Sequence, residues 1–392
     1  MISSPWLLLA LFLAIAAGFF LGRMETRRRR RLRRGPRGLP TFLSRDTTTS
    51  PRDHALEALL SSTDTDPDTV DTHLAMGRLF RKRGELERAT RLHQRMADNP
   101  ELPETVREDA ALELARDYLS AGLLDRAEAL LQHMVDHGNR HAPLAMRQLM
   151  MLFEQERDWH SALSTGERLL RRDASVAPVL AHYCCELAER LNPREENARR
   201  RLLHRALTFD PGCARASMLQ GQLERAAGHP ERALRAFRRV RRQAPQHLPL
   251  VLNDLAASYQ DLEREDELFD MLLDLSLAYP SSALLRRLIP LLVARGGEGE
   301  AVRFLTSYLQ QHPSLEGLGE LAALALSGEG SSEALAESGN TQARAQEQSL
   351  RLLRALTERS ASTGYQCSQC GYRATKMHWH CPSCKHWNTL AP

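Results

Sequence analysis

Aromatic residues are scarce in this chain, and the sequence patterns that mark a catalytic centre are absent from it. Phe, Trp and Tyr make up 5% of the 392 residues. The chain has no glycine-rich phosphate-binding loop, no His-Glu-x-x-His pair for a catalytic zinc ion, and no serine in a nucleophile elbow. We therefore predict that the protein is not an enzyme.

Excess basic charge is also absent from most of the chain, although the pI is near 8.7. The formal net charge is +4, and residues 23–37 alone hold nine arginines and one glutamate, a contribution of +8. The rest of the chain therefore carries about −4. The arginine clusters elsewhere have no aromatic side chains interleaved for stacking on bases. This balance argues against a protein that binds nucleic acid.

The amino terminus has the features of a single membrane anchor. Residues 5–22 form a run of eighteen residues without a charge, which is long enough to cross a bilayer as a helix. Residues 1–4 lack the basic side chains that precede the apolar core of a signal peptide. Basic residues follow the run instead, at Arg23 and in residues 27–34, and such residues stay in the cytoplasm. We predict a transmembrane anchor in residues 1–22, with the amino terminus outside and the remaining chain in the cytoplasm.

Residues 23–52 indicate a basic juxtamembrane segment followed by a linker. Arginines beside an apolar span suit contact with anionic lipid headgroups. Pro, Gly, Ser and Thr are frequent from residue 35 onward, which favours a flexible connection.

A helical repeat occupies the middle of the chain. Small residues, a turn glycine, a large apolar residue and a terminating proline recur in a fixed order, so that two antiparallel helices can pack closely and the second then ends. About seven units follow one another between residues 68 and 313. This pattern resembles the tetratricopeptide family and predicts an all-α solenoid in residues 53–327, with an irregular α-helical bundle as the alternative. The recurring positions are clearest in the fifth unit, at Ala214, Gly221, Gly228, Ala233, Phe237, Val240 and Pro245.

Two departures from the repeat predict local irregularity. Arg199 stands where a small residue is expected, and the matching residues Gly77 and Ala115 are 38 positions apart rather than about 34. We expect distorted packing or a longer loop in these units. After the repeats, residues 328–363 indicate a linker and a helix that caps the array.

Charged side chains on the first helix of each unit define a candidate partner surface. Stacked repeats curve, and the first helices line the concave face where partners usually bind. A moderately basic groove is predicted there, with an ordinary solvated face as the alternative. A second arginine cluster, in residues 232–242, lies on the second helix of the fifth unit and is interpreted as surface. The groove residues are Arg78, Arg81, Lys82, Arg116, Arg225 and Asn253.

The carboxyl terminus carries the most specific chemistry. Four cysteines form two Cys-x-x-Cys knuckles with ten residues between them, and each short spacer aims two thiolates at one point. This predicts a tetrahedral site of four sulfurs in residues 364–392, a domain too small to fold without metal. It looks like a rubredoxin or zinc-ribbon pair of knuckles. The predicted ligands are Cys367, Cys370, Cys381 and Cys384.

Zn2+ is the favoured ion, and iron is the chemical alternative for such a site. A mixed Cys/His site would recruit His378, His380 or His386, but four thiolates already fill the coordination shell. A disulfide pair conflicts with a cytoplasmic location. Gly371, directly after the second cysteine, suits a turn with positive φ. The aromatic side chains expected to exclude water from the site are Tyr365, Tyr372, Trp379 and Trp387.

Three further cysteines lie in the repeat region. Cys184 and Cys185 are adjacent in an apolar stretch, and Cys213 follows a helix-ending Asp-Pro-Gly. We interpret them as buried, reduced thiols.

The order of these parts resembles one family across the whole chain. An apolar anchor, an arginine-rich flank, a tetratricopeptide array and a terminal Cys-x-x-Cys-Gly-Tyr…Trp-His-Cys-Pro-Ser-Cys-x-x-Trp together are similar to the lipopolysaccharide assembly protein B family of Gram-negative bacteria. The resemblance rests on this order and on residues 379–387.

The resemblance implies a regulator of lipopolysaccharide synthesis at the inner membrane. Such proteins are adaptors that present the deacetylase LpxC to the protease FtsH and respond to an inner-membrane sensor of lipopolysaccharide supply. It also implies a periplasmic amino terminus and a rubredoxin-like domain, packed on the array, whose metal ligands are the four carboxyl-terminal cysteines.

Two other classes of function fit part of the same pattern. One is a membrane-anchored tetratricopeptide scaffold or chaperone for another assembly pathway, with the knuckles as a docking cap. The other is a redox protein with an iron centre on the four sulfurs. A zinc ribbon that binds nucleic acid is disfavoured by the charge balance.

Overall fold

The computed structural model describes residues 69–327 and 364–391. The predicted anchor in residues 1–22, the segment 23–52 and the linker with its capping helix in residues 328–363 lie outside these stretches. Within the described stretches, every helix is too short or too polar to span a bilayer.

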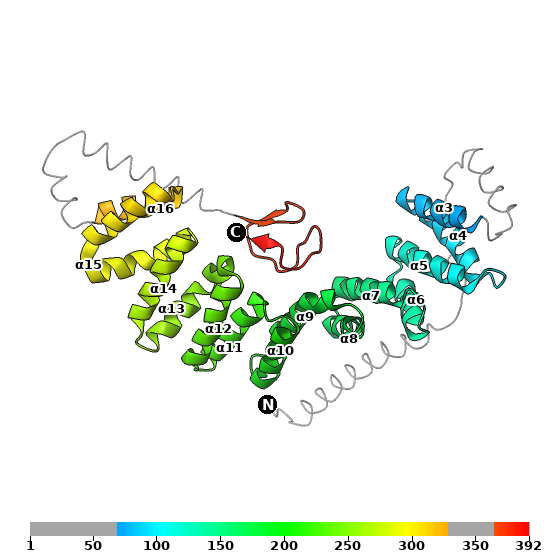
Figure 1. Ribbon diagram of the computed structural model, residues 1–392, viewed down its shortest axis with the longest axis horizontal. Helices are drawn as coiled ribbons and strands as arrows, with labels where there is room; N and C mark the ends of the chain where they lie inside the picture. Colours follow the sequence, from blue (N-terminus) through cyan, green and yellow to red (C-terminus); the bar gives the residue numbers. More distant parts are fainter. Residues whose placement is uncertain (1–68, 328–363, 392) are drawn as a thin grey trace, which may run out of the picture. The chain divides into compact units, whose positions relative to one another are not determined.

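Successive helices pair as antiparallel hairpins, and each helix packs chiefly against those before and after it in the chain (Figure 1). The solenoid predicted from the repeat is therefore confirmed, and the irregular bundle is wrong. The pairs are α3 (Val70–Lys82) with α4 (Leu86–Asp98), α5 (Glu104–Ser120) with α6 (Leu124–Asp136), α7 (Ala142–Glu156) with α8 (Trp159–Leu170), α9 (Ala177–Arg190) with α10 (Glu196–Phe209), α11 (Ala214–Ala226) with α12 (Pro230–Gln243), and α13 (Leu252–Gln260) with α14 (Glu265–Ala278).

The last hairpin of the array lies within one helical segment that is kinked in the middle. Helix α15 (Ser282–Gln311) is interrupted at Gly297, where φ is 76° and ψ is 173°, so that its two halves form one further pair. Helix α16 (Leu315–Ser327) packs against α15. Two short 3-10 helices, η1 (Ala174–Val176) and η2 (Pro245–Val251), precede α9 and α13.

Small side chains let the two helices of a hairpin touch. A Cβ atom added at Gly221 on α11 would lie 2.3 Å from the Phe237 ring on α12, and one at Gly77 on α3 would lie 2.3 Å from the His93 ring on α4. The large side chain thus occupies the space that the glycine leaves, as the repeat predicts. At Gly228 the chain reverses with φ at 76°, a conformation that favours glycine.

The two departures from the repeat have structural counterparts. The first is the wider spacing between the first two units, which is taken up by the connection at residues 99–103 and by α5, which has 17 residues against 13 in α3. The second is Arg199, whose Nε atom is buried without a hydrogen-bond partner. Only Leu203 and Ala206 are buried on its helix α10. Helix α10 nevertheless packs along α9, whose side chains supply most of the buried surface of this unit.

The carboxyl-terminal residues form a small β structure, so the all-α class holds for the array only. Strand β1 (Tyr365–Cys367) pairs antiparallel with β2 (Arg373–Ala374) on one side and with β3 (Leu390–Ala391) on the other. Its interior consists of Cys367, Cys381 and Leu390. So small a core leaves the fold dependent on the four cysteines.

We predict that Gly221→Ala destabilises the array by about 1–3 kcal/mol, because the added methyl group collides with the Phe237 ring. Urea unfolding followed by circular dichroism measures the change. Gly299→Ala is the matched control, because a Cβ atom there meets nothing within 4 Å. Equal stability of the two variants would contradict this helix contact.

Candidate metal centre and the surface that holds it

Four sulfur atoms converge at the carboxyl terminus. The Sγ atoms of Cys367, Cys370, Cys381 and Cys384 all lie within 4.8 Å of one another. Cys367 and Cys384 are 3.7 Å apart and Cys370 and Cys381 are 3.8 Å apart. A tetrahedral site with metal–sulfur bonds of about 2.3 Å needs sulfurs about 3.8 Å apart, whereas a disulfide needs about 2 Å. The geometry therefore fits one tetrahedrally bound ion and excludes disulfides.

Backbone turns aim these sulfurs. In each knuckle the residue after the second cysteine has positive φ, 74° at Gly371 and 60° at Lys385. The amide of Gly371 donates to the Cys367 carbonyl at 2.9 Å, and that of Lys385 donates to the Cys381 carbonyl at 3.0 Å. The turn predicted at Gly371 is present. Its equivalent at Lys385 was not predicted, because lysine rarely adopts this conformation.

The electrostatics of the four thiols call for a cation. A hydrogen bond with the Thr389 hydroxyl and nearby backbone amides lower the pKa of Cys367 to about 6. The His386 amide lowers the pKa of Cys384, but burial and the neighbouring thiols outweigh it and raise that pKa to about 12. Four thiolates at this spacing repel one another, so an ion between them is what allows all four to ionise.

Two of the three neighbouring histidines, His380 and His386, hydrogen-bond to backbone carbonyls. His380 Nε2 lies 2.9 Å from the Lys385 carbonyl, and His386 Nδ1 lies 2.9 Å from the Cys384 carbonyl. Among the described residues, the potential ligands that cluster here are cysteines alone. The arrangement favours the four-sulfur site over the mixed Cys/His alternative.

Trp387 joins this domain to the array. Its indole Nε1–H donates to Glu154 Oε1 at 2.8 Å, and the Tyr183 hydroxyl donates to the same oxygen at 2.7 Å. The Trp387 ring stacks on His182, with centroids 5.0 Å apart, and meets Trp159 edge-on at 5.9 Å. The residues on either side of this contact are separated by up to 233 positions in the chain.

Trp379 makes a second contact with the array. Its ring lies 5.2 Å from the His247 ring, and the Arg215 guanidinium lies 5.8 Å from the Trp379 centroid. Arg215 is only 4% exposed and pairs with Glu186 at 2.8 Å and Glu189 at 2.5 Å. An arginine at such a depth needs these carboxylates, and the aromatic face adds a cation–π contact.

Together these array residues form what we name the docking platform. Burial lowers the pKa of His182 to about 3, and the charges of Arg215 and His380 act in the same direction. Burial also lowers the pKa of His247. Both imidazoles are therefore held neutral against the indole rings. The docking platform consists of Glu154, His182, Tyr183, Arg215 and His247.

The two tryptophans pack on different parts of the array core. Trp387 packs against the apolar cluster that runs from α5 to α11, and Trp379 packs against the cluster that runs from α11 to α15. The small domain therefore contacts repeats that are not adjacent in the array.

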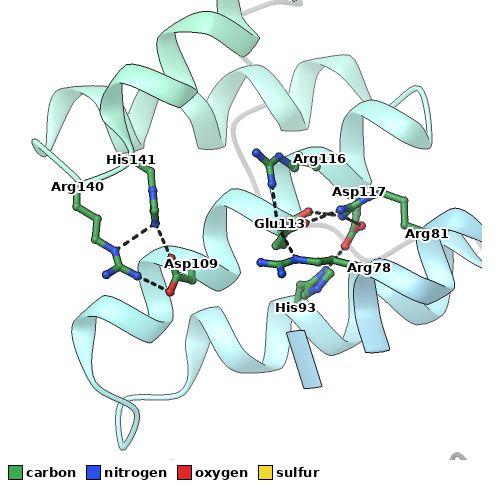
Figure 2. Close-up of polar contacts among 9 residues, drawn as sticks. All are labelled: Arg78, Arg81, His93, Asp109, Glu113, Arg116, Asp117, Arg140 and His141. Atoms are coloured by element: carbon green, nitrogen blue, oxygen red, sulfur yellow. Dashed lines mark hydrogen bonds and ion pairs between the residues drawn. The ribbon is translucent and has the colours of Figure 1, made fainter. Parts of the chain in front are cut away.

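The predicted groove residues of the first two units come together on one carboxylate (Figure 2). Glu113 Oε1 accepts from Arg78 Nε at 2.9 Å and from Arg116 Nη1 at 2.7 Å, and Glu113 Oε2 accepts from Arg81 Nη2 at 2.5 Å. Arg81 Nη1 also donates to Asp117 at 2.6 Å. Burial opposes the charge of Glu113, but the hydrogen bond from Arg81 and the nearby guanidinium charges outweigh it and lower the pKa of Glu113.

The other predicted groove residues take no part in the hydrogen bonds to Glu113. Arg225 pairs with Asp254 of the next repeat at 3.0 Å, and Asn253 beside it is exposed. Lys82, at the end of α3, is exposed. The six residues thus form two separate sets, one on α3 and α5 and one on α11 and α13. The metal domain contacts α7, α8, α9, α11 and η2.

The remaining sequence features have plain structural roles. Cys184, Cys185 and Cys213 are buried free thiols, as expected. On α12, Arg238 pairs with Glu267 of the next repeat at 2.6 Å, and Arg239 donates to Gln220 at 2.5 Å. Part of this arginine cluster therefore joins neighbouring helices.

Sequence reasoning missed the docking platform. Glu154, His182 and Arg215 belong to no motif, and their partners are far away in the chain. One signal was available for His182 and Arg215: each is a polar side chain between apolar or small neighbours in its helix, and such a position usually has a specific partner.

Comparisons with known proteins agree with this domain order. Residues 365–392 match the family described as "Rubredoxin metal binding domain". Lipopolysaccharide assembly protein B of Escherichia coli K12 is 30% identical over 98% of this chain and 97% of its own length. The protein of the same name from Haemophilus influenzae is 29% identical over 82% of this chain and 79% of its own. These names describe assembly and no reaction, which agrees with a protein that is not an enzyme.

Solved structures are similar only at the level of helical arrays. A tetratricopeptide repeat protein from Parabacteroides merdae covers 66% of this chain and 99% of its own at 14% identity, with a TM-score of 0.33. A MamA protein covers 46% of this chain and 95% of its own at 16% identity, also with a TM-score of 0.33. Matches at this level carry no argument about this chain. The rubredoxin match and the four adjacent sulfurs, by contrast, support a metal ion at the cysteine cluster.

We predict that Glu154→Ala releases the metal domain from the array while leaving the metal bound. The change removes the acceptor of both Trp387 and Tyr183, a loss of about 2–4 kcal/mol in docking. Tryptophan fluorescence should shift to longer wavelength as Trp387 becomes solvated, at unchanged metal content. Glu156→Ala, at an exposed position on the same helix, is the control. An unshifted spectrum in Glu154→Ala would contradict the docking role.

We predict that Glu113 makes the first repeats sensitive to acid. Because its folded pKa lies below the ordinary value of 4.5, its contribution is present above that pH and is lost as the pH falls through the folded pKa. Thermal unfolding between about pH 7 and pH 3 should show a smaller acid loss in Glu113→Gln than in the unaltered chain. The same acid loss in both would contradict the assignment.

Proposed function

This chain belongs to the lipopolysaccharide assembly protein B family, and from that premise we propose that it is an adaptor at the inner membrane that regulates lipopolysaccharide synthesis. The proposed action is to present the deacetylase LpxC to the protease FtsH, under the control of an inner-membrane sensor of lipopolysaccharide supply. The observation that carries the proposal is the similarity to lipopolysaccharide assembly protein B over nearly the whole chain.

The arrangement of the parts supports a protein that binds other proteins rather than an enzyme. The array offers long helical faces, and its metal domain is fixed on the docking platform by hydrogen bonds and ring contacts. Burial lowers the pKa of His182 and of His247, so both imidazoles are neutral there. A repeat array with a docked metal domain suits the presentation of one protein to another.

We assign the remaining parts on the same premise. Residues 1–22 are the single transmembrane anchor, with a periplasmic amino terminus, and residues 23–52 are the basic flank and linker. Residues 53–327 form the cytoplasmic array, and residues 328–363 lead through a capping helix to the metal domain of residues 364–392. Anchoring the adaptor beside an anchored protease confines both to one plane, so weak contacts gain from a high effective concentration.

Cys367, Cys370, Cys381 and Cys384 are the proposed ligands of a structural Zn2+ ion, with iron as the chemical alternative. A closed shell of four thiolates leaves no open position for a substrate, so the ion would stabilise the fold and not act on a reactant. Metal analysis with an absorption spectrum separates the two ions, because zinc is colourless and ferric iron on four sulfurs is red.

We predict that the double change Cys381→Ser and Cys384→Ser unfolds the metal domain, because two of the four metal ligands are lost. The adaptor should then present less deacetylase to the protease, and the cellular level of the deacetylase should rise several-fold. Quantitative immunoblotting measures the level. The pair Ser368→Ala and Gln369→Ala, at exposed positions of the same domain, should leave it unchanged.

Capture of partners from detergent extracts tests the adaptor directly. The full chain should recover the protease and the deacetylase, and a chain that begins at Arg23 should lose the protease first. Normal deacetylase turnover in the cysteine variant, or capture of neither protein by the full chain, would contradict the proposal.

A further inference from the structure

A buried carboxylate organises the surface of the first two repeats. Glu113, on α5, has a side chain only 2% exposed, and it accepts hydrogen bonds from three guanidinium groups at once. Arg78 and Arg81 reach it from α3, and Arg116 reaches it from its own helix (Figure 2). One carboxylate therefore fixes three arginines across two repeats.

Two of these arginines keep unused donors that face solvent. Arg78 gives only its Nε–H to Glu113, and its side chain is 50% exposed. Arg116 gives only a hydrogen on Nη1, and its side chain is 37% exposed. Both bind the same Oε1 atom, so the two guanidinium groups are neighbours. Each has further N–H groups in a planar fork, the geometry that suits a carboxylate.

Buried side chains below Glu113 fix the positions of Arg78 and Arg116. Arg81 is only 17% exposed and links Glu113 to Asp117, and Asp117 Oδ2 lies 2.5 Å from His93 Nδ1. His93 and Asp117 are completely buried, and the His93 ring packs against Gly77. A receptor fixed in this way loses little side-chain entropy when it binds.

The charge of the group is not balanced. Three guanidinium groups face two carboxylates, Glu113 and Asp117, so one positive charge remains, and the exposed Lys82 adds another. By contrast, Arg225 and Arg238 are each paired with a carboxylate of the next repeat.

We propose that Arg78 and Arg116, held side by side on Glu113, form a receptor for a carboxylate side chain in an acidic segment of a protein partner. The proposal deepens the adaptor function and rests on it, since it gives one partner surface of the array a defined chemistry. Lys82, one helical turn after Arg78 on α3, adds positive charge on the same helix.

The surroundings favour a peptide over a lipid surface. Arg78 and Arg116 both bind Glu113 Oε1, so their remaining N–H groups lie close together. Donors at one point suit one or two carboxylates rather than a spread of lipid headgroups.

The first test uses the full chain in detergent and a fluorescein-labelled peptide with two adjacent glutamates in a glycine-serine context. Fluorescence anisotropy should show binding that falls at least about tenfold in Arg78→Gln with Arg116→Gln, in line with loss of charge-assisted hydrogen bonds. The matching peptide with glutamines should not bind. Arg95→Gln, at an exposed position on α4, is the control.

A second pair of variants separates a fixed receptor from diffuse charge. Glu113→Gln makes the surface more positive but frees the forks, so the receptor model predicts weaker peptide binding. Glu108→Gln makes the same change in charge on the same helix and should leave binding equal or slightly stronger. Circular dichroism checks each fold, and the single variant Arg116→Gln replaces any that unfolds.

Three results would overturn the proposal. They are unchanged binding in the arginine variants, stronger binding in Glu113→Gln, and loss of binding to phosphatidylglycerol vesicles with no loss of peptide binding. The last would assign the arginines to a lipid surface. Because purified protein and a defined peptide are used, failure here leaves the capture of the protease and deacetylase as a separate question.

Discussion

The hydrogen bond from Trp387 to Glu154 is the contact on which the arrangement of this protein depends. It joins the metal domain, which has a core of only three buried residues, to a repeat array with a large apolar core. The rings of Trp159 and His182 surround the contact. Glu154 also accepts from Tyr183, so its charge is matched by two donors from different parts of the chain. The metal domain is in this sense part of the array.

The metal domain contacts two parts of the array core. Trp387 packs on the apolar cluster that runs from α5 to α11, and Trp379 packs on the cluster that runs from α11 to α15. Repeat arrays are stabilised by contacts between neighbouring repeats. The metal domain adds contacts between repeats that are not neighbours, so its loss should weaken the array near α9 and α11.

The sequence predicted those structural features that depend on the spacing of residues close together in the chain. Paired Cys-x-x-Cys knuckles converge because two-residue spacers leave few conformations, and the column of Gly77 and Gly221 marks helix contact because only a small side chain fits. The docking platform was missed because its contacts join residues more than 130 positions apart in the chain. The basic groove was predicted from the positions that recur on the first helix of each repeat. The ion pairs of Arg78 with Glu113 and of Arg225 with Asp254 join different repeats, so they depend on how one repeat is rotated relative to the next.

The central claim is that the metal-bound domain and the array form one structural unit. Amide hydrogen exchange of α9 and α11 in the full chain, before and after removal of the metal by a chelator, tests it most directly. We expect exchange in these helices to become faster when the metal is removed, although neither contributes a ligand. Unchanged exchange in α9 and α11, with a fully unfolded metal domain, would contradict the account.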